Sequence, residues 1–268
     1  MMGTDIIPGE GWSSGESYER YVGRWSRMVA QDFIRWLAIS ENRQWLDVGC
    51  GTGAISQTIL DLAKPKKVKG IDRSEDHIDE ARQRVNHPNA IFEIGDAQAL
   101  PVESGIYDAA VSGLVLNFIP LPNQMLAEMV RVVRKNGVVA LYVWDYAGRM
   151  QLMRHFWNAA AALDSAAHDM DEGRRFPICN LRSLTQLFQE AGLVHVETRP
   201  IDISTDFKNF EDFWTPFLGG QGPAPGYVMS LNEEQRVQLR DRIYNSLPFA
   251  LDGSVSLVAR AWAIKGVK

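Results

Sequence analysis

Cysteine is nearly absent from this chain of 268 residues, which contains only Cys50 and Cys179. Two thiols so far apart in the sequence exclude a disulfide framework and the paired spacing of a zinc site. We therefore predict a reducing compartment and no bound metal. Cys50 lies inside a glycine-rich run, where we expect it to be a small residue that fills the loop rather than a nucleophile.

An excess of positive charge is also missing. Lys and Arg number 28 against 33 Asp and Glu, so the net charge is −5 at pH 7 and the isoelectric point is near 5.6. Sequence-independent affinity for nucleic acid comes chiefly from Lys and Arg that neutralise phosphates. We therefore expect no nucleic-acid partner.

Long apolar runs are not found either. No stretch approaches the ~20 apolar residues that a membrane-spanning helix needs. Residues 1–15 are acidic and rich in glycine, without the basic start and apolar core of a secretory signal. We expect a cytoplasmic protein without a membrane span.

What the chain does have is a run of alternating glycines, Trp45-Leu46-Asp47-Val48-Gly49-Cys50-Gly51-Thr52-Gly53. The run begins as an apolar strand and leads into a helix-like segment at 54–63. Glycine has no Cβ, so such a loop lets a ligand lie directly against the main chain and the free N–H groups of the helix. We predict a strand, a ligand-binding loop and a helix.

Two kinds of ligand suit this loop. Gly49, Gly51 and Ala54 satisfy the dinucleotide pattern G-x-G-x-x-G/A, and Arg73 could favour the 2′-phosphate of NADP. Asp47 argues against a dinucleotide, because its carboxylate would face an anionic pyrophosphate but could hold a cationic ammonium group. A ligand with an amino-acid end fits better, and an NAD(P)-dependent oxidoreductase is the alternative.

Four segments together resemble the class I S-adenosylmethionine (SAM)-dependent methyltransferases. They are Leu46 to Gly53, then Gly70-Ile71-Asp72-Arg73-Ser74, then Gly95-Asp96-Ala97, and then Tyr107-Asp108-Ala109-Ala110-Val111-Ser112. Their order and spacing are those of the family, over roughly residues 42–146. The chain is most similar to the branch that includes ubiquinone- and menaquinone-biosynthesis methyltransferases.

The resemblance implies a cofactor, SAM, with S-adenosylhomocysteine as the product. It implies that Asp72 binds the ribose hydroxyls, that Asp96 and Ala97 meet the adenine, and that an N-terminal helix closes over the methionine end. The implied cofactor-binding residues are Tyr21, Arg24, Trp25, Asp47, Gly49, Cys50, Gly51, Gly53, Asp72, Arg73, Asp96, Ala97, Ser112 and Leu114.

Three further residues are candidates for the methyl acceptor's site. We expect Asn117, Trp144 and Tyr146 to orient the substrate, with Asn117 and Tyr146 as the candidate catalytic residues. Asn117 stands where similar small-molecule methyltransferases often carry a histidine. An amide can orient a nucleophile but cannot take its proton at neutral pH, so the sequence establishes no general base.

Hydrophobic periodicity alternates between strands and helices, which predicts an α/β fold with parallel pairing. With the resemblance, we expect a Rossmann-like sheet of seven strands, mostly parallel, with helices on both faces, an antiparallel last strand, and helical insertions that form a lid. The expected helices are 18–39, 54–63, 75–85, 123–134, 150–163, 181–191 and 232–245. The expected strands are 45–48, 68–71, 90–94, 107–111, 138–144, 194–203 and 253–264.

We interpret residues 1–268 as a single methyltransferase domain. Its expected parts are an N-terminal cap region at 1–41, the SAM-binding core at 42–146, substrate-side insertions at 147–180 and 205–250, and the last strand at 251–268. Within the second insertion, residues 218–227 read as a long Gly/Pro loop, which we expect to be a binding element.

The function that follows is methyl transfer from SAM to a small molecule. The chain has no Asn-Pro-Pro-Tyr-type run and no Pro-Cys nucleophile, and the bulky aromatics of the insertions suit an apolar or aromatic acceptor. Besides the oxidoreductase, a SAM-binding protein without catalysis remains an alternative.

Overall fold

The computed structural model describes residues 24–219 and 222–268, with side chains from Trp25 onward. These residues form two compact units, and the chain passes from one unit to the other several times. Of the residues described, one unit contains 26–144, 178–202 and 260–268, and we call it the sheet unit. The other contains 24–25, 145–177 and 203–259 apart from 220–221, and we call it the helical unit.

A sheet of seven strands in the order β3-β2-β1-β4-β5-β7-β6 organises the sheet unit. Four of the strand pairs are parallel, β1 with β2, β2 with β3, β1 with β4 and β4 with β5, and β7 runs antiparallel to β5. The strands are β1 (Gln44–Val48), β2 (Lys67–Asp72), β3 (Ala90–Ile94), β4 (Tyr107–Gly113), β5 (Val133–Trp144), β6 (Val194–Phe207) and β7 (Val255–Val267). The expected fold class is confirmed.

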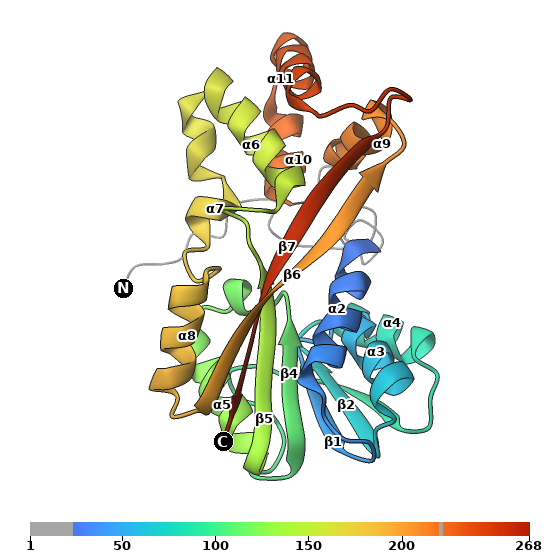
Figure 1. Cartoon of the computed structure of the whole chain (residues 1–268), viewed down its shortest axis with the longest axis vertical. Helices are drawn as coiled ribbons and strands as arrows, with labels where there is room; N and C mark the ends of the chain where they lie inside the picture. The colour runs from blue at the N-terminus through green and yellow to red at the C-terminus, as the bar shows by residue number, and fades with distance from the viewer. Residues whose placement is uncertain (1–23, 220–221) are drawn as a thin grey trace. The chain divides into compact units, whose positions relative to one another are not determined.

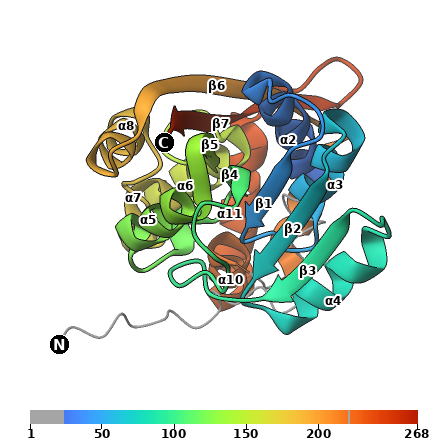
Figure 2. The same cartoon turned by 90° about the horizontal axis from the view of Figure 1, so that it is seen from below.

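Helices cover both faces of this sheet, with α2, α3 and α4 on one face and α5 and α8 on the other (Figures 1 and 2). Their bounds are α2 (Arg24–Leu37), α3 (Ala54–Ala63), α4 (Glu75–Arg84), α5 (Pro122–Val132) and α8 (Leu181–Glu190). Central parallel strands are covered on both sides, which explains why β1 and β4 are almost continuously buried. Trp45, Leu46, Ile59 and Ile71 lie fully buried in the resulting core.

The helical unit has an aromatic core of its own. Its helices are α6 (Gln151–Leu163), η3 (Ser165–Asp169), α7 (Glu172–Arg175), α9 (Phe210–Trp214), η4 (Thr215–Gly219), α10 (Pro223–Ser230) and α11 (Glu233–Ser246). Phe156 of α6 stacks on Phe217 at 4.6 Å between ring centroids, and Trp157 lies 5.9 Å from Tyr227. His155 of α6 is 3.0 Å from the Ser246 hydroxyl of α11. The two segments that we expected to be insertions therefore pack on each other.

One prediction about the backbone is wrong. Residues 223–227, which read as part of a Gly/Pro loop, lie in helix α10 (Pro223–Ser230), whose first residue is Pro223. Both prolines, Pro223 and Pro225, fall in the first turn, where a helix needs no backbone N–H donor. The preceding Gly222 takes a φ of 90°, which lets the chain turn into the helix.

No helix in the described ranges combines the length and the apolar character that crossing a bilayer requires.

Candidate functional site

The glycine loop connects the carboxyl end of β1 to the first residue of α3. Gly49, Gly51 and Gly53 have φ values of +71°, +52° and +88°, a region of backbone space that L side chains rarely adopt. The N–H groups of Gly49 and Cys50 both donate to the carbonyl of Ile71, at 2.7 and 3.0 Å. The loop is thus fixed against the next strand of the sheet.

The three glycines differ in what surrounds them. A Cβ on Gly49 would lie 2.5 Å from Val115 Cγ2, and one on Gly53 would lie 2.7 Å from Val85 Cγ2. A Cβ on Gly51 would meet nothing within 4 Å. Gly51 is therefore the point at which a ligand can approach the main chain directly.

Asp47, near the end of β1, is a fully buried acid with one unused oxygen. Its Oδ2 accepts a hydrogen bond of 2.7 Å from the Ser56 hydroxyl of α3, whereas Oδ1 has no partner among the described residues. The pKa of Asp47 is raised to about 7, chiefly by burial and to a smaller extent by the negative charge of Asp72, while the side chain and backbone of Ser56 act against the rise. A buried acceptor left unmatched costs about 1–3 kcal/mol, so this oxygen is suited to a cationic donor from a ligand.

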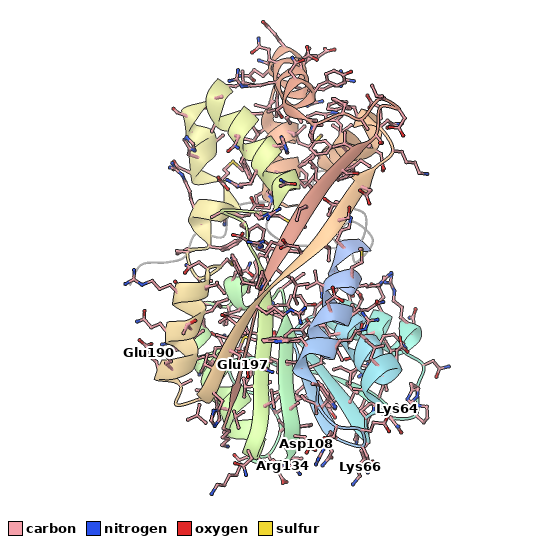
Figure 3. The ribbon with its side chains drawn as sticks, in the orientation of Figure 1. Lys64, Lys66, Asp108, Arg134, Glu190 and Glu197 are labelled. Carbon is pink, nitrogen blue, oxygen red and sulfur yellow. The ribbon has the colours of Figure 1, made fainter. Side chains whose placement is uncertain are left out.

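Asp108, at the opposite end of the sheet, is a useful comparison because it is also buried. Its carboxylate accepts from the backbone N–H of Gln44 at 2.8 Å and pairs with Arg43 at 3.4 Å and with Arg134. Figure 3 shows Asp108 and Arg134 together at the amino ends of the strands. Both carboxylate oxygens of Asp108 therefore have partners. Asp47, near the carboxyl end of β1, differs because one of its oxygens has no partner among the described residues.

Asp72, the last residue of β2, is tied to the glycine loop. Its Oδ2 accepts from Gly51 N at 2.9 Å, its Oδ1 accepts from Ser74 N at 2.9 Å, and His77 Nδ1 lies 3.7 Å from Oδ1. Burial alone would raise the pKa of Asp72, but these donors outweigh it and hold the pKa below its usual range. In return, the bond to Asp72 raises the pKa of His77. Asp72 is an ionised acceptor held in one orientation.

The remaining expected cofactor residues of the sheet unit lie along the same edge. Asp96 is exposed just after β3, and its Oδ1 accepts from Gln98 N at 2.8 Å, beside the buried Ala97. The Ser112 hydroxyl is used inside the sheet, because it donates to the Val48 carbonyl at 2.7 Å. Leu114 has a φ of +63°, and this strained backbone follows β4 directly.

Asn117 lies in the short helix η2 (Leu116–Phe118). Both Nδ2 and Oδ1 are shielded from solvent and without a hydrogen-bond partner in the described part of the chain. A ligand that offers both an acceptor and a donor would satisfy this amide.

Two loop residues have different surroundings. Cys50 is buried, and burial followed by the charges of Asp47 and Asp72 raises the pKa of its thiol well above the usual value. A thiol of this kind stays protonated and unreactive, as expected for a residue that fills the loop. Arg73 is exposed next to Asp72.

The remaining expected residues are Tyr21, Arg24, Trp25, Trp144 and Tyr146. Tyr21 is outside the described residues, and of Arg24 only its place at the start of α2 is described. Trp25 is buried edge-on against Phe207, at 5.5 Å. Trp144 is a buried residue that ends β5 in the sheet unit, and Tyr146 lies in the helical unit, where it packs on Phe176 at 5.6 Å.

Sequence reasoning missed two residues, Ser56 and His77. Ser56 lies on the buried face of α3 with Ile59 and Leu60, and a polar residue on such an apolar face is a readable signal. His77 is in the first turn of α4, three positions after the Ser74 N-cap, and nothing in the sequence pattern distinguishes it. No group of His, Cys, Asp and Glu able to hold a metal occurs in the portion of the chain that the structure describes.

These residues fit the cofactor expected from the sequence. Asp47 offers an ammonium group a carboxylate oxygen that nothing in the described part of the chain occupies, and Gly51 leaves room at the main chain. Asp72 is an ionised, oriented acceptor for ribose hydroxyls. A pyrophosphate would instead bring negative charge to two carboxylates.

Comparisons with known proteins agree with this fit. Residues 46–141 match the family model described as a methyltransferase domain. The chain is 29% identical over 171 residues to the demethylmenaquinone methyltransferase of Bacillus licheniformis, an alignment that covers 58% of this chain and 72% of that protein. It is 40% identical over 104 residues to an uncharacterized 37.1 kDa protein of transposon Tn4556 from Streptomyces fradiae.

That last alignment covers 37% of this chain and only 30% of the Streptomyces protein. Among solved structures, phosphoethanolamine N-methyltransferase 2 of Haemonchus contortus, in complex with S-adenosyl-L-methionine, has a similar fold with a TM-score of 0.60. The sequences are 14% identical, and the match covers 94% of this chain and 56% of the other.

Proposed function

Because this chain belongs to the class I SAM-dependent methyltransferases, with SAM as its cofactor, we propose that it transfers a methyl group to a small acceptor. The observation that carries the proposal is Asp47, a buried carboxylate just ahead of the glycine loop, one oxygen of which has no partner among the described residues. When bound, SAM supplies a methyl group made electrophilic by a positively charged sulfur. The protein then has to hold the cofactor and align a nucleophile, with little acid or base chemistry.

We assign the cofactor's two ends to two carboxylates. Asp47 binds the ammonium group of the methionine end, and Asp72, oriented by Gly51 and Ser74, accepts hydrogen bonds from the ribose hydroxyls. Asp96 and Ala97 belong to the adenine side. The other cofactor contacts in the proposal are Tyr21, Arg24, Trp25, Gly49, Cys50, Gly53, Arg73, Ser112 and Leu114, all within the cap region and the core at 42–146.

We propose an apolar or aromatic acceptor, and the Bacillus licheniformis relative is named for methyl transfer to demethylmenaquinone. Asn117 orients it through an amide whose two polar atoms have no partner in the described residues. Trp144 and Tyr146 are the further substrate contacts in the proposal. An amide does not remove a proton at neutral pH, so Asn117 positions the acceptor and does not act as its base.

The first test substitutes the ribose acceptor. Asp72→Ala should weaken binding of S-adenosylhomocysteine by about 1–3 kcal/mol, because ribose hydroxyls and the Gly51 N–H lose a common acceptor. Isothermal titration of the full chain measures the dissociation constant. Asp76→Ala is the matched control, since Asp76 is an exposed acid in the first turn of α4.

The same titration distinguishes the competing functions. Wild-type protein should bind SAM and S-adenosylhomocysteine and give no heat with NADPH, and radiolabelled methyl transfer should appear with one class in a panel of phenols, quinols and amines. Binding of NADPH without a response to either SAM species would overturn the proposed function. An unchanged dissociation constant in Asp72→Ala would remove only the ribose assignment.

A further inference from the structure

Ser56 has no place in the sequence motifs, yet it makes the one side-chain hydrogen bond that Asp47 has among the described residues. It is the third residue of α3, and its side chain is fully buried. Its hydroxyl donates to Oδ2 of Asp47 at 2.7 Å, and Oδ1 is left without a partner in the region that the structure describes. Ser56 thereby makes the two carboxylate oxygens inequivalent.

The surroundings of Asp47 make the hydrogen bond from Ser56 important for its ionisation. The residues beside it in the sheet are Gly70 of β2 and Val111 of β4, neither of which carries charge. Among the described residues, Asp72 is the titratable group that acts on Asp47, and its negative charge raises the pKa of Asp47. The nearby Cys50 thiol stays neutral, because burial and the charges of Asp47 and Asp72 raise its own pKa. Ser56 is the group that works in the other direction, through both its hydroxyl and its backbone.

We propose that Ser56 is a positioning residue for the cofactor, which holds one oxygen of Asp47 and leaves the other as the receptor for the ammonium group. This inference rests on the proposed function, because it assumes that Asp47 receives the methionine end of SAM. Ser56 does not touch the cofactor in this assignment. It acts by fixing the orientation of the carboxylate and by favouring its ionised form.

A consequence is that cofactor binding depends on pH. Binding an ammonium group needs Asp47 ionised, and its pKa of about 7 leaves it partly protonated at neutral pH. Affinity should therefore fall as the pH drops below about 7, with a proton released on binding. Loss of the Ser56 hydroxyl removes a donor to the charged form, so the fall should begin at a higher pH.

The test compares two ligands that differ only at the amino-acid end. S-adenosylhomocysteine carries the ammonium group, and 5′-methylthioadenosine lacks it. Dissociation constants are measured by isothermal titration between about pH 5.5 and about pH 9 for wild type, Ser56→Ala and Ser56→Thr. We expect Ser56→Ala to weaken S-adenosylhomocysteine about tenfold at pH 7 and to move the midpoint upward, with Ser56→Thr in between and 5′-methylthioadenosine unaffected.

Thr58→Ala is the matched control. Thr58 is also a buried hydroxyl on α3, but it donates to the Ala54 carbonyl rather than to Asp47. Its removal should leave the pH profile unchanged. If Ser56→Ala does not fold, Ser56→Cys takes its place under the same criteria, since it keeps the size and donates only weakly.

Two results would overturn the inference. One is an unchanged pH profile for S-adenosylhomocysteine in Ser56→Ala, and the other is a parallel loss of both ligands, which would indicate a general structural role. Failure of wild type to bind either ligand would instead refute the proposed function, so the two failures are distinguishable.

Discussion

At the scale of single residues, the buried carboxylate of Asp47 should favour ligand binding and lower the stability of the folded protein. The native pKa of about 7 stands against an ordinary value of 3.8, so above pH 7 the folded protein carries an ionised group that burial disfavours. We predict that Asp47→Asn raises the free energy of unfolding at pH 8, by about 1–2 kcal/mol once the cost of a buried amide is subtracted. The same variant should bind S-adenosylhomocysteine at least about tenfold more weakly.

Asp108→Asn is the contrasting variant, measured in the same urea titrations. It removes a buried carboxylate that Arg43, Arg134 and the Gln44 N–H already satisfy, and it should lower the free energy of unfolding by about 1–3 kcal/mol. If both variants were destabilised equally, Asp47 would have to be fully partnered in the free protein.

The sequence located Asp47 and Asp72 at the ends of their strands because their distance from the glycines is set by the length of strand and loop. It did not reveal their partners. Ser56 and His77 come to the acids through the turn of a helix, and such contacts depend on side-chain direction in three dimensions. The motif therefore predicts which carboxylates meet the ligand, but it does not predict which side chains orient those carboxylates.

At the scale of elements, substitutions in the glycine loop should distinguish a glycine that packing requires, Gly49, from one that faces the ligand, Gly51. Gly49→Ala would place a Cβ 2.5 Å from Val115, whereas Gly51→Ala would place one in open space, and both positions have positive φ. We predict that Gly49→Ala costs about 2–4 kcal/mol of stability and Gly51→Ala about 1 kcal/mol. Gly51→Ala should lose affinity for S-adenosylhomocysteine out of proportion to its stability.

Gly105→Ala provides the reference for backbone strain alone. Gly105 has a φ of +71° and nothing within 4 Å of its added Cβ, and it precedes β4 rather than following a strand. Thermal unfolding and titration of the three variants measure both quantities. Equal stability losses in Gly49→Ala and Gly105→Ala would contradict the packing argument.

The bounds of the helices and strands in the sheet unit could be predicted closely, because these elements have similar lengths and a regular hydrophobic pattern. The predicted ranges of α3 and β3 coincide with those observed. Prediction failed at α10, where two prolines and flanking glycines read as a loop. Whether prolines begin a helix or break one depends on their position in its first turn, which the sequence alone does not mark.

At the scale of the whole molecule, the described residues of each unit include one buried acid with a raised pKa. Burial raises the pKa of Glu172 to about 7, with Trp157 and Arg154 acting against the rise, and Asp47 is its counterpart in the sheet unit. A folded acid with a raised pKa binds more protons than the unfolded chain does. Its contribution to stability therefore falls as pH rises from the ordinary value toward 7, and the loss is complete above that.

We predict that the melting temperature of the ligand-free protein decreases between about pH 5 and about pH 8, and that Glu172→Gln raises it at the upper end of this range. His77, whose pKa is raised, adds to the decrease, and His155, whose pKa is lowered by burial, opposes it. Scanning calorimetry across this range measures the effect. A lower melting temperature for Glu172→Gln at pH 8 would mean that the Glu172 carboxylate is net stabilising.

S-adenosylhomocysteine provides the internal check. In the proposed function its ammonium group pairs with Asp47. Bound ligand should therefore reverse the part of the decrease in melting temperature that Asp47 causes, and leave the part caused by Glu172 unchanged. Wild type and Glu172→Gln with saturating ligand should therefore still differ at pH 8.

The bond from Gly51 to Asp72 has a thermodynamic consequence for recognition. Two backbone donors, Gly51 N and Ser74 N, already immobilise the carboxylate and the loop before any nucleoside arrives. Little conformational freedom is then left to lose on association, so the entropic penalty is small and encounters should be fast. Variants that free this carboxylate should show their deficit mainly in the entropy of binding and in slower capture of the nucleoside.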